Sequence, residues 1–212
     1  MDNKNNQTTS QQTQSVSPRV IKSESSAFGR WIARIFELIK VVVILTMLGY
    51  LSHVFVATLF VVDGASMEPS YHDKEYMMVN KIEYKLTQPK RGDVVVFKYP
   101  GEIKQKFIKR IIGLPGEKVQ IKDGGVFIYN KQNPQGKRLN ESYINTITPT
   151  ETGADMITRE IGPDEYFVMG DNRYNSSDSR IWGLLPKTNL IGRAWFIFWP
   201  TSYIGLVARP QF

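Results

Sequence analysis

Residues 94–129 read VVVFKYPGEIKQKFIKRIIGLPGEKVQIKDGGVFIY, and this stretch decides the fold class. Short runs rich in Val, Ile, Phe and Tyr alternate here with the turn signals Pro100-Gly101, Pro115-Gly116 and Asp123-Gly124-Gly125. Runs of this length and composition, bounded by Gly and Pro, are typical of β-strands joined by tight turns. The stretch therefore predicts strands at Val94–Tyr99, Lys106–Ile112, Lys118–Ile121 and Val126–Tyr129.

The same pattern continues on both sides of this stretch. Further strands are predicted at Tyr76–Asn80, Glu165–Met169 and Ala194–Trp199, and no long helix-period stretch lies between them. Residues 63–212 should thus form a mainly β domain, either a barrel or a folded pair of sheets. The polar residues 130–160 have weak strand character, so we expect them to form an inserted hairpin or loop.

The N-terminal part of the chain differs from the rest. Residues 1–26 are polar, and thirteen of the first seventeen are Asn, Gln, Ser or Thr, which predicts a disordered tail. Val41 to Val62 is an uncharged run, VVVILTMLGYLSHVFVATLFVV. Its 22 residues are long enough, as a helix, to cross a bilayer core of about 30 Å. We expect one transmembrane helix here, and residues 27–40 either continue it or lie along the membrane surface.

Flanking charge predicts the orientation of this helix. More positive residues precede the apolar run than follow it: Lys22, Arg30, Arg34 and Lys40 against Lys74 and Lys81. Short loops rich in Lys and Arg stay on the cytoplasmic side. The tail is therefore expected in the cytoplasm and the β domain outside.

Composition excludes several classes of function. The chain has no cysteine and only two histidines, so cysteine nucleophiles, Cys-based zinc sites and multi-His metal sites are ruled out or hard to build. The net charge is +7, but no dense run of Lys and Arg accompanies it. We therefore expect no metal, no cofactor and no nucleic-acid partner.

Ser66 lies in the segment Asp63-Gly64-Ala65-Ser66, directly after the predicted membrane helix. Gly64 and Ala65 are small and would allow a substrate backbone to approach the hydroxyl closely. Taken alone, the segment favours an ordinary surface serine in a strand-loop junction. Ser66 can act as a nucleophile only if another part of the chain places a base beside it.

Lys109 stands in the predicted strand Lys106–Ile112. The two-residue period of a strand places it on one face with Phe107 and Ile111. Apolar neighbours would desolvate its ammonium group and lower its pKa, as a general base requires. The alternative is an edge-strand lysine with its head in water. Arg110 faces the other way and, if buried, needs a carboxylate partner.

Residues 170–180, GDNRYNSSDSR, hold carboxylates, guanidinium groups and hydroxyls in close succession. Such a segment forms either a solvated loop or a buried polar network in which every donor finds an acceptor. The apolar residues before it, Tyr166-Phe167-Val168, and Trp182 after it favour burial.

These segments together resemble the type I bacterial signal peptidases, in the short, single-anchor form. The resemblance is carried by SMEPS (66–70), RGDVVVF (91–97), FIKRIIGLPGE (107–117) and GDNRYNSSDSR (170–180), in this order after a membrane helix. It covers about residues 35–200. It implies a membrane-bound serine endopeptidase that cleaves signal peptides from exported preproteins after small residues.

The resemblance also implies roles for single residues. Ser66 matches the nucleophile, Lys109 the general base and Ser176 a hydroxyl that orients the lysine. The implied structural ion pairs are Asp171–Arg110 and Asp178–Arg180. The positions that match substrate-pocket residues are Val62, Met67, Phe107 and Ile108.

Two departures from the family pattern concern the same loop. Gly64 stands where some members carry a serine that donates to the oxyanion, so this chain should rely on backbone N–H groups such as that of Ser66. Ser70 replaces a usual threonine and keeps its hydroxyl.

The expected surroundings follow from this function. The partners would be preprotein signal peptides and the lipid bilayer, and the enzyme would be a monomer. The host would be the bacterial cytoplasmic (inner) membrane, or a membrane of the thylakoid type. A substrate would bind extended at a strand edge near Gly64.

Three other interpretations remain open from the sequence. A Ser-His-Asp triad would use His72 with Asp73, Asp171 or Asp178. A membrane protein whose β domain only binds or scaffolds would use none of these groups chemically. A self-cleaving Ser-Lys regulator would share the pair, but such proteins are normally soluble.

Overall fold

The computed structural model describes residues 27–55, 57–144, 146–149 and 155–212. It divides into two units, residues 1–46 and 47–212, and we describe each by itself. The disordered tail predicted for residues 1–26 lies outside the described residues.

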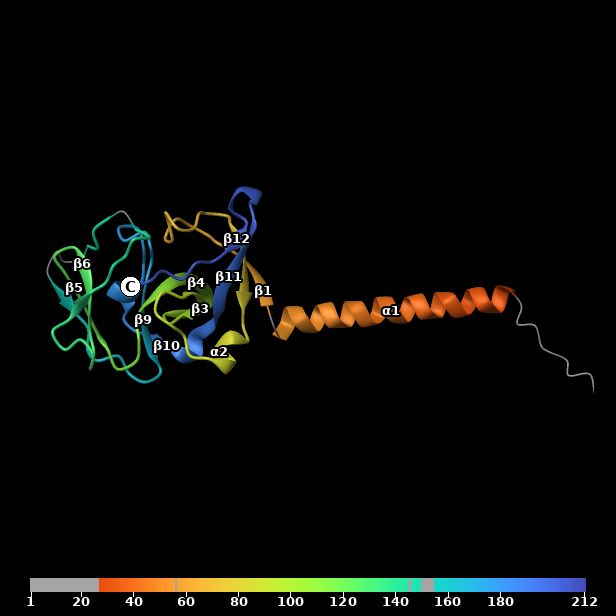
Figure 1. The fold of residues 1–212 in the computed structure, drawn as a ribbon, viewed down its shortest axis with the longest axis horizontal. Coiled ribbons are helices and arrows are strands. Elements are labelled where there is room, and N and C mark those ends of the chain that lie inside the picture. Colours follow the sequence, from red (N-terminus) through yellow and green to blue (C-terminus); the bar gives the residue numbers. More distant parts are fainter. Residues whose placement is uncertain (1–26, 56, 145, 150–154) are drawn as a thin grey trace, which may run out of the picture. The chain divides into compact units, whose positions relative to one another are not determined.

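The N-terminal unit consists of the first part of helix α1, Ala27–Phe55, which is continuous along its length (Figure 1). The helix thus includes residues 27–40, one of the two arrangements expected for them. Among the described residues, no helix combines the length and the hydropathy needed to cross a membrane.

The predicted helix boundary at Val62 is wrong. Helix α1 ends at Phe55, and Ala57–Val61 form strand β1, which pairs antiparallel with β2 (Tyr76–Asn80). A short apolar run cannot be assigned to helix or strand by its periodicity alone. Pairing with β2 decides the matter here, and it brings the chain from the helix into the main sheet.

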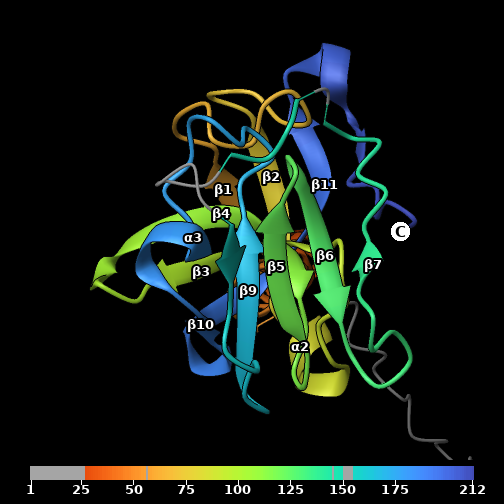
Figure 2. The same ribbon diagram turned by 90° about the vertical axis from the view of Figure 1, so that its left-hand side faces the viewer.

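The larger of two antiparallel sheets forms the body of residues 47–212 (Figure 2). Its strand order is β1-β2-β11-β3-β4-β9-β10, with β12 added to β11. The strands not yet given are β3 (Val94–Tyr99), β4 (Glu102–Gly113), β9 (Glu165–Met169), β10 (Leu185–Pro186), β11 (Leu190–Trp199) and β12 (Gly205–Leu206). Strands that are far apart in sequence, such as β2 and β11, pair directly in this sheet.

The second sheet has the order β7-β6-β5-β8. Its bounds are Lys137–Arg138 for β7, Gly125–Tyr129 for β6, Lys118–Lys122 for β5 and Met156–Ile157 for β8. The edge strands β7 and β8 come from the segment 130–160, which was expected to be an inserted hairpin or loop. Its other described residues form turns and loops, and β7 and β8 pair with β6 and β5, respectively.

Short helical turns complete the domain. The single-turn helices α2 and α3 span Glu83–Leu86 and Ser179–Trp182, and the 3₁₀ turns η1 and η2 span Lys187–Asn189 and Thr201–Tyr203. Helix α3 begins at an N-cap, Asp178, whose side chain accepts a hydrogen bond from the N–H of Arg180.

The core consists of three hydrophobic clusters, and β4 contributes to all of them. Ile112 belongs to the cluster that includes the inner face of the second sheet, and Ile111 belongs to a cluster with Phe97 and Tyr166. Ile108 packs against a third cluster, which contains Val62 and Met67. Strand β4 is therefore held from several sides, so the side chains it carries are rigidly placed.

The prediction of a mainly β fold is confirmed. Three predicted strands have the observed bounds, namely β2, β3 and β9, whereas β4 and β11 begin earlier than predicted. Residues 102–105 (EIKQ) and 190–193 (LIGR) lack an unbroken apolar pattern, because Glu, Lys, Gln, Gly or Arg interrupt it. Antiparallel pairing with β3 nevertheless extends both strands over these residues.

Candidate active site

Ser66 lies in the loop that joins β1 to β2. The base of this loop is closed by two backbone hydrogen bonds, from Val62 N to Glu75 O and from Lys74 N to Val62 O, both 2.8 Å. Gly64 has a φ of +92°, a left-handed conformation that favours glycine, and there is open space where a Cβ would stand. The loop therefore presents the Ser66 hydroxyl beside an unobstructed stretch of backbone.

The residues 170–172 hold the Ser66 backbone from the other side. Asn172 donates its backbone N–H to Ser66 O (3.1 Å), and its amide Nδ2 donates to Ala65 O (3.1 Å). Gly170 packs so closely that a Cβ built on it would lie 2.4 Å from Ser66 O. A side chain at position 170 would displace the serine, which explains the need for glycine there.

Lys109 reaches Ser66 from strand β4. Its Nζ lies 2.8 Å from Ser66 Oγ and donates to Ile108 O at 2.9 Å. The residue is only 4% exposed, and Nζ also lies 5.3 Å from the centre of the Phe107 ring. Of the two alternatives for Lys109, burial beside Phe107 is thus the one observed, and the fold brings Lys109 and Ser66 together over 43 residues of sequence.

Burial lowers the pKa of Lys109 to about 8, and the charge of Arg180 acts in the same direction. The carboxylates of Asp178 and Asp171 act in the opposite direction, but burial outweighs them. A lysine with this pKa has a substantial neutral fraction near neutral pH. Neutral Nζ can accept the proton of the Ser66 hydroxyl across the observed distance.

Ser176 does not make the expected hydrogen bond to Lys109. Its Oγ is buried and has no hydrogen-bond partner among the residues that the structure describes, and it lies 2.2 Å from where a Cβ on Gly170 would stand. Lys109 Nζ instead makes its two hydrogen bonds to Ser66 and Ile108. The backbone carbonyl of Ile108 thus does the orienting that the sequence assigned to a side chain.

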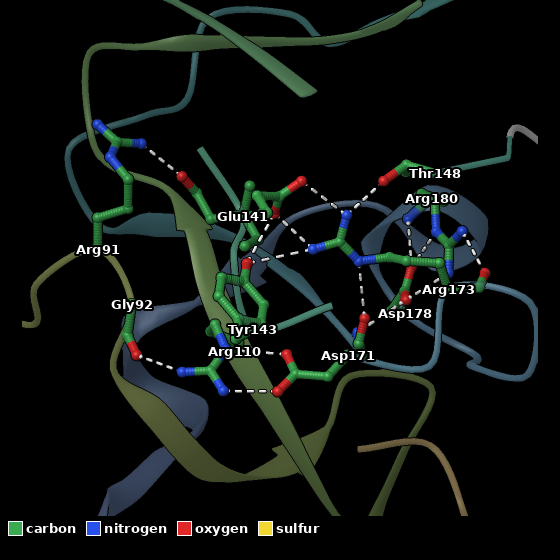
Figure 3. Close-up of polar contacts among 12 residues, drawn as sticks. Arg91, Gly92, Arg110, Glu141, Tyr143, Thr148, Asp171, Arg173, Asp178 and Arg180 are labelled. Atoms are coloured by element: carbon green, nitrogen blue, oxygen red, sulfur yellow. Dashed lines mark hydrogen bonds and ion pairs between the residues drawn. The ribbon is translucent and has the colours of Figure 1, made fainter. Parts of the chain in front are cut away.

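The charged residues beside the pair form a buried network (Figure 3). Arg110 donates Nε to Asp171 Oδ1 (2.8 Å) and Nη2 to Oδ2 (2.5 Å), and its Nη1 donates to Gly92 O. Arg180 donates Nε and Nη2 to Asp178 (both 2.8 Å). Both ion pairs inferred from the resemblance are therefore present, and the carboxylate that buried Arg110 requires is Asp171.

A cavity of about 510 Å³ opens on Ser66 and Lys109. Of the pocket residues inferred from the resemblance, Val62, Phe107 and Ile108 line it. Met67 is not among the lining residues, and its side chain packs in the core cluster of Val62. The lining residues that sequence reasoning missed include Phe60, Met77, Val96 and Ser177.

Of the backbone N–H groups expected to stabilise an oxyanion, that of Gly64 already has a partner. The Gly64 N–H donates to Asp73 Oδ1 at 2.7 Å, so it is already engaged. Backbone stabilisation of an oxyanion would therefore fall to the N–H of Ser66 rather than to that of Gly64.

His72, the residue on which the triad interpretation depends, has other partners. Its Nδ1 lies 3.0 Å from Glu75 Oε1, and its ring stacks on that of Tyr203 at 4.9 Å between centroids. In the part of the chain that the structure describes, no group of three His, Asp or Glu side chains is arranged to hold a metal ion.

Sequence reasoning also missed residues that support the site from a distance. Arg173 is buried and donates to Gly170 O (3.0 Å), and Glu141 and Tyr143 contact it from the segment 130–160. A signal was present, because Arg173 belongs to the polar block 170–180. Its partners could not be found, since they lie about 30 residues away in a stretch with weak strand character.

Comparison with known proteins gives consistent matches. A family model described as "Signal peptidase, peptidase S26" matches residues 35–199. A probable signal peptidase I-2 of Synechocystis sp. is 38% identical over 191 residues, which cover 88% of this chain and 81% of the relative. A signal peptidase I of Bacillus amyloliquefaciens is 39% identical over 173 residues, which cover 78% of this chain and 88% of the relative.

Among solved structures, a signal peptidase I of Enterococcus faecalis V583 is similar to this chain. The match covers 50% of this chain and 97% of the solved chain. The TM-score is 0.42 and the sequence identity is 29%.

Proposed function

This chain belongs to the signal peptidase family, peptidase S26, and we propose that Ser66 and Lys109 are the catalytic pair with which it works. It is a serine endopeptidase that cleaves signal peptides from secreted preproteins. The observation that carries the proposal is the 2.8 Å separation of Lys109 Nζ and Ser66 Oγ, with the lysine buried and its pKa lowered to about 8.

The reaction begins when neutral Lys109 removes the proton from Ser66 Oγ while the oxygen attacks the carbonyl carbon of the scissile bond. The tetrahedral intermediate carries its negative charge on the former carbonyl oxygen, and the N–H of Ser66 supports that charge. Lys109 then gives the proton to the leaving amine, which departs as the new N-terminus. A water molecule, deprotonated by Lys109, hydrolyses the acyl ester on Ser66 and restores both side chains.

The cavity beside the pair accepts the residues that precede the cut. Its walls are β1 and the part of β4 that leads to Lys109, so a substrate lying between them would be extended. The apolar lining of Val62, Ile108 and Met77 suits small apolar side chains better than charged ones. This lining supports cleavage after small apolar residues, which the family resemblance implies.

We propose that the N-terminal region around helix α1 anchors the enzyme in the bacterial cytoplasmic membrane or in a thylakoid membrane. The β domain would lie outside, and a single chain would be the working unit. The support is the uncharged run that starts at Val41, the positive residues before it and the cyanobacterial relative. The partners are the preprotein and the bilayer, and nucleic acid plays no part.

The catalytic pair is tested by cleavage of one model preprotein by the wild type, Ser66→Ala and Lys109→Ala. Each replacement should reduce cleavage by at least about three orders of magnitude, because the nucleophile or its base is lost. His72→Ala serves as the matched control and should cleave nearly as fast as the wild type. Persistent cleavage by Ser66→Ala or Lys109→Ala would refute the pair, and loss of cleavage in His72→Ala would revive the triad.

A further inference from the structure

The segment between β7 and β8 contacts the buried arginine Arg173 through three side chains (Figure 3). Glu141 accepts two hydrogen bonds from this guanidinium, from Nη1 to Oε2 at 2.9 Å and from Nη2 to Oε1 at 2.5 Å. Tyr143 Oη accepts a further bond from Nη2 at 3.2 Å, and Thr148 Oγ1 accepts one from Nη1. The Arg173 side chain is 0% exposed, so these contacts replace its hydration entirely.

Arg173 in turn fixes the residues that hold the nucleophile. Its Nε donates to Gly170 O (3.0 Å), and its own carbonyl accepts a bond from Arg180 Nη1 (2.7 Å). Between these two points lies Asn172, whose N–H donates to Ser66 O. Any shift of Arg173 therefore moves the short turn against which the Ser66 backbone rests.

Tyr143 also reaches the strand that carries the base. The guanidinium of Arg110 lies over its ring, 4.3 Å from the centroid, and Arg110 directly follows Lys109 in β4. The Tyr143 hydroxyl donates to Glu141 Oε1 at 2.7 Å. Burial, and then the charge of Glu141, raise the pKa of Tyr143, so the hydroxyl keeps its proton and this bond.

Glu141 supplies the carboxylate that pairs with the buried charge of Arg173. Arg110 has Asp171 as its carboxylate and Arg180 has Asp178, both from the polar block 170–180. Arg173 has Glu141, which comes from a different part of the chain. Without Glu141 the network would contain a buried guanidinium whose charge is not compensated.

We propose that Glu141 and Tyr143 are positioning residues for the catalytic reaction, which hold Arg173 and Arg110 and thereby set Ser66 Oγ and Lys109 Nζ within reach of each other. This gives the segment 130–160 a role in catalysis although neither residue lines the substrate cavity. The inference rests on the proposed catalytic pair.

The test is a comparison of kcat and KM for the full-length wild type and Glu141→Gln on a model preprotein. Assays are run well below the melting temperature of each protein, and rates are corrected for the folded fraction measured by circular dichroism. We expect kcat to fall at least about tenfold, because small displacements of reacting groups are costly. KM should stay within about twofold of the wild type, because the cavity walls are untouched.

The matched control is Ile128→Ala, which leaves a void in the core of the second sheet and lowers stability without touching the network. Its corrected kcat should equal that of the wild type. The inference would be overturned if Glu141→Gln had the same corrected kcat as Ile128→Ala, or if only its KM changed. Glu141 would then be a structural residue.

Tyr143 supplies a second test that does not depend on the folding of Glu141→Gln. Tyr143→Phe keeps the ring under Arg110 and should lose less kcat than Tyr143→Leu, which removes both contacts. Equal and unreduced kcat in both would contradict the proposal.

Ser66→Ala and Lys109→Ala are assayed in the same series. If these two are inactive while Glu141→Gln and Tyr143→Leu retain the wild-type kcat, only the positioning role fails. If either of the first two remains active, the catalytic pair itself fails.

Discussion

At the scale of the residue, the chemistry depends on how Lys109 is desolvated. Its ammonium form loses hydration by burial, and the two carboxylates that raise its pKa, Asp178 and Asp171, are each paired with an arginine. The charge of Arg180 opposes their attraction for the ammonium, and burial is the largest influence on the pKa of Lys109. The same two ion pairs that organise the loop therefore also keep the lysine available as a base.

The two side chains of the pair were predictable from the sequence to different degrees. The strand alternation around Lys109 indicated burial on physical grounds, and the structure shows it. Nothing local to Ser66 distinguished it from a surface serine, and only the family resemblance singled it out. The hydrogen bond expected between Ser176 and Lys109 is not formed, and Lys109 Nζ donates to Ile108 O. A sequence motif does not record which backbone atoms will compete for a side chain's hydrogen bonds.

At the scale of the element, strand β1 is where we expect an extended substrate to pair. It is the end strand of the larger sheet, and its outer edge pairs with no other strand among those that the structure describes. Residues of β1 line the cavity from Thr58 to Val61, opposite the residues of β4 that lead to Lys109. A peptide between them can hydrogen-bond as an added strand, and its side chains would then point alternately into the cavity and out.

We expect N-methylation of the substrate backbone to reveal this pairing. Peptides methylated at one N–H at a time over the three residues before the cut should lose affinity at alternate positions. Each lost hydrogen bond should raise KM about fivefold, a loss of about 1 kcal/mol. A peptide methylated well upstream, beyond the cavity, serves as control. An equal effect at every position, or none at all, would contradict strand addition.

The elements themselves show where sequence patterns are informative. Long β-branched runs such as Val94–Tyr99 gave the observed strand bounds, because burial on both faces leaves few alternatives. Strand β1 was assigned to the membrane helix because its residues, ATLFV, are as apolar as the helix before it. The two-residue strands β7 and β8 carry no periodic signal, and their pairing is set by the β5–β6 hairpin between them.

At the scale of the whole molecule, the chain carries an N-terminal helix before a β domain, and we expect that domain to work outside the cytoplasm. The sequence predicts this orientation from the charges before Val41. It could not reveal the network around Arg173, because that network assembles residues from β4, from the segment after β7 and from the block 170–180. Such long-range contacts follow from topology and not from local pattern.

The orientation can be tested with single cysteines, because the natural chain contains none. A membrane-impermeant thiol reagent applied to intact spheroplasts should label a cysteine at exposed Lys131 in the β domain. A cysteine at Ser10 in the N-terminal tail should be labelled only after the membrane is permeabilised. The reverse pattern would place the β domain in the cytoplasm and contradict the account.

The central claim is that Lys109 acts as the neutral base of Ser66, and the pH dependence of kcat/KM tests it most directly. Protonated Lys109 cannot accept a proton, so activity should be low below the pKa of the lysine and should rise as pH increases through about 8. The account predicts a single ionisation on this rising limb, with a midpoint near pH 8. A profile that is flat across this range, or that falls as pH rises through it, would contradict the account.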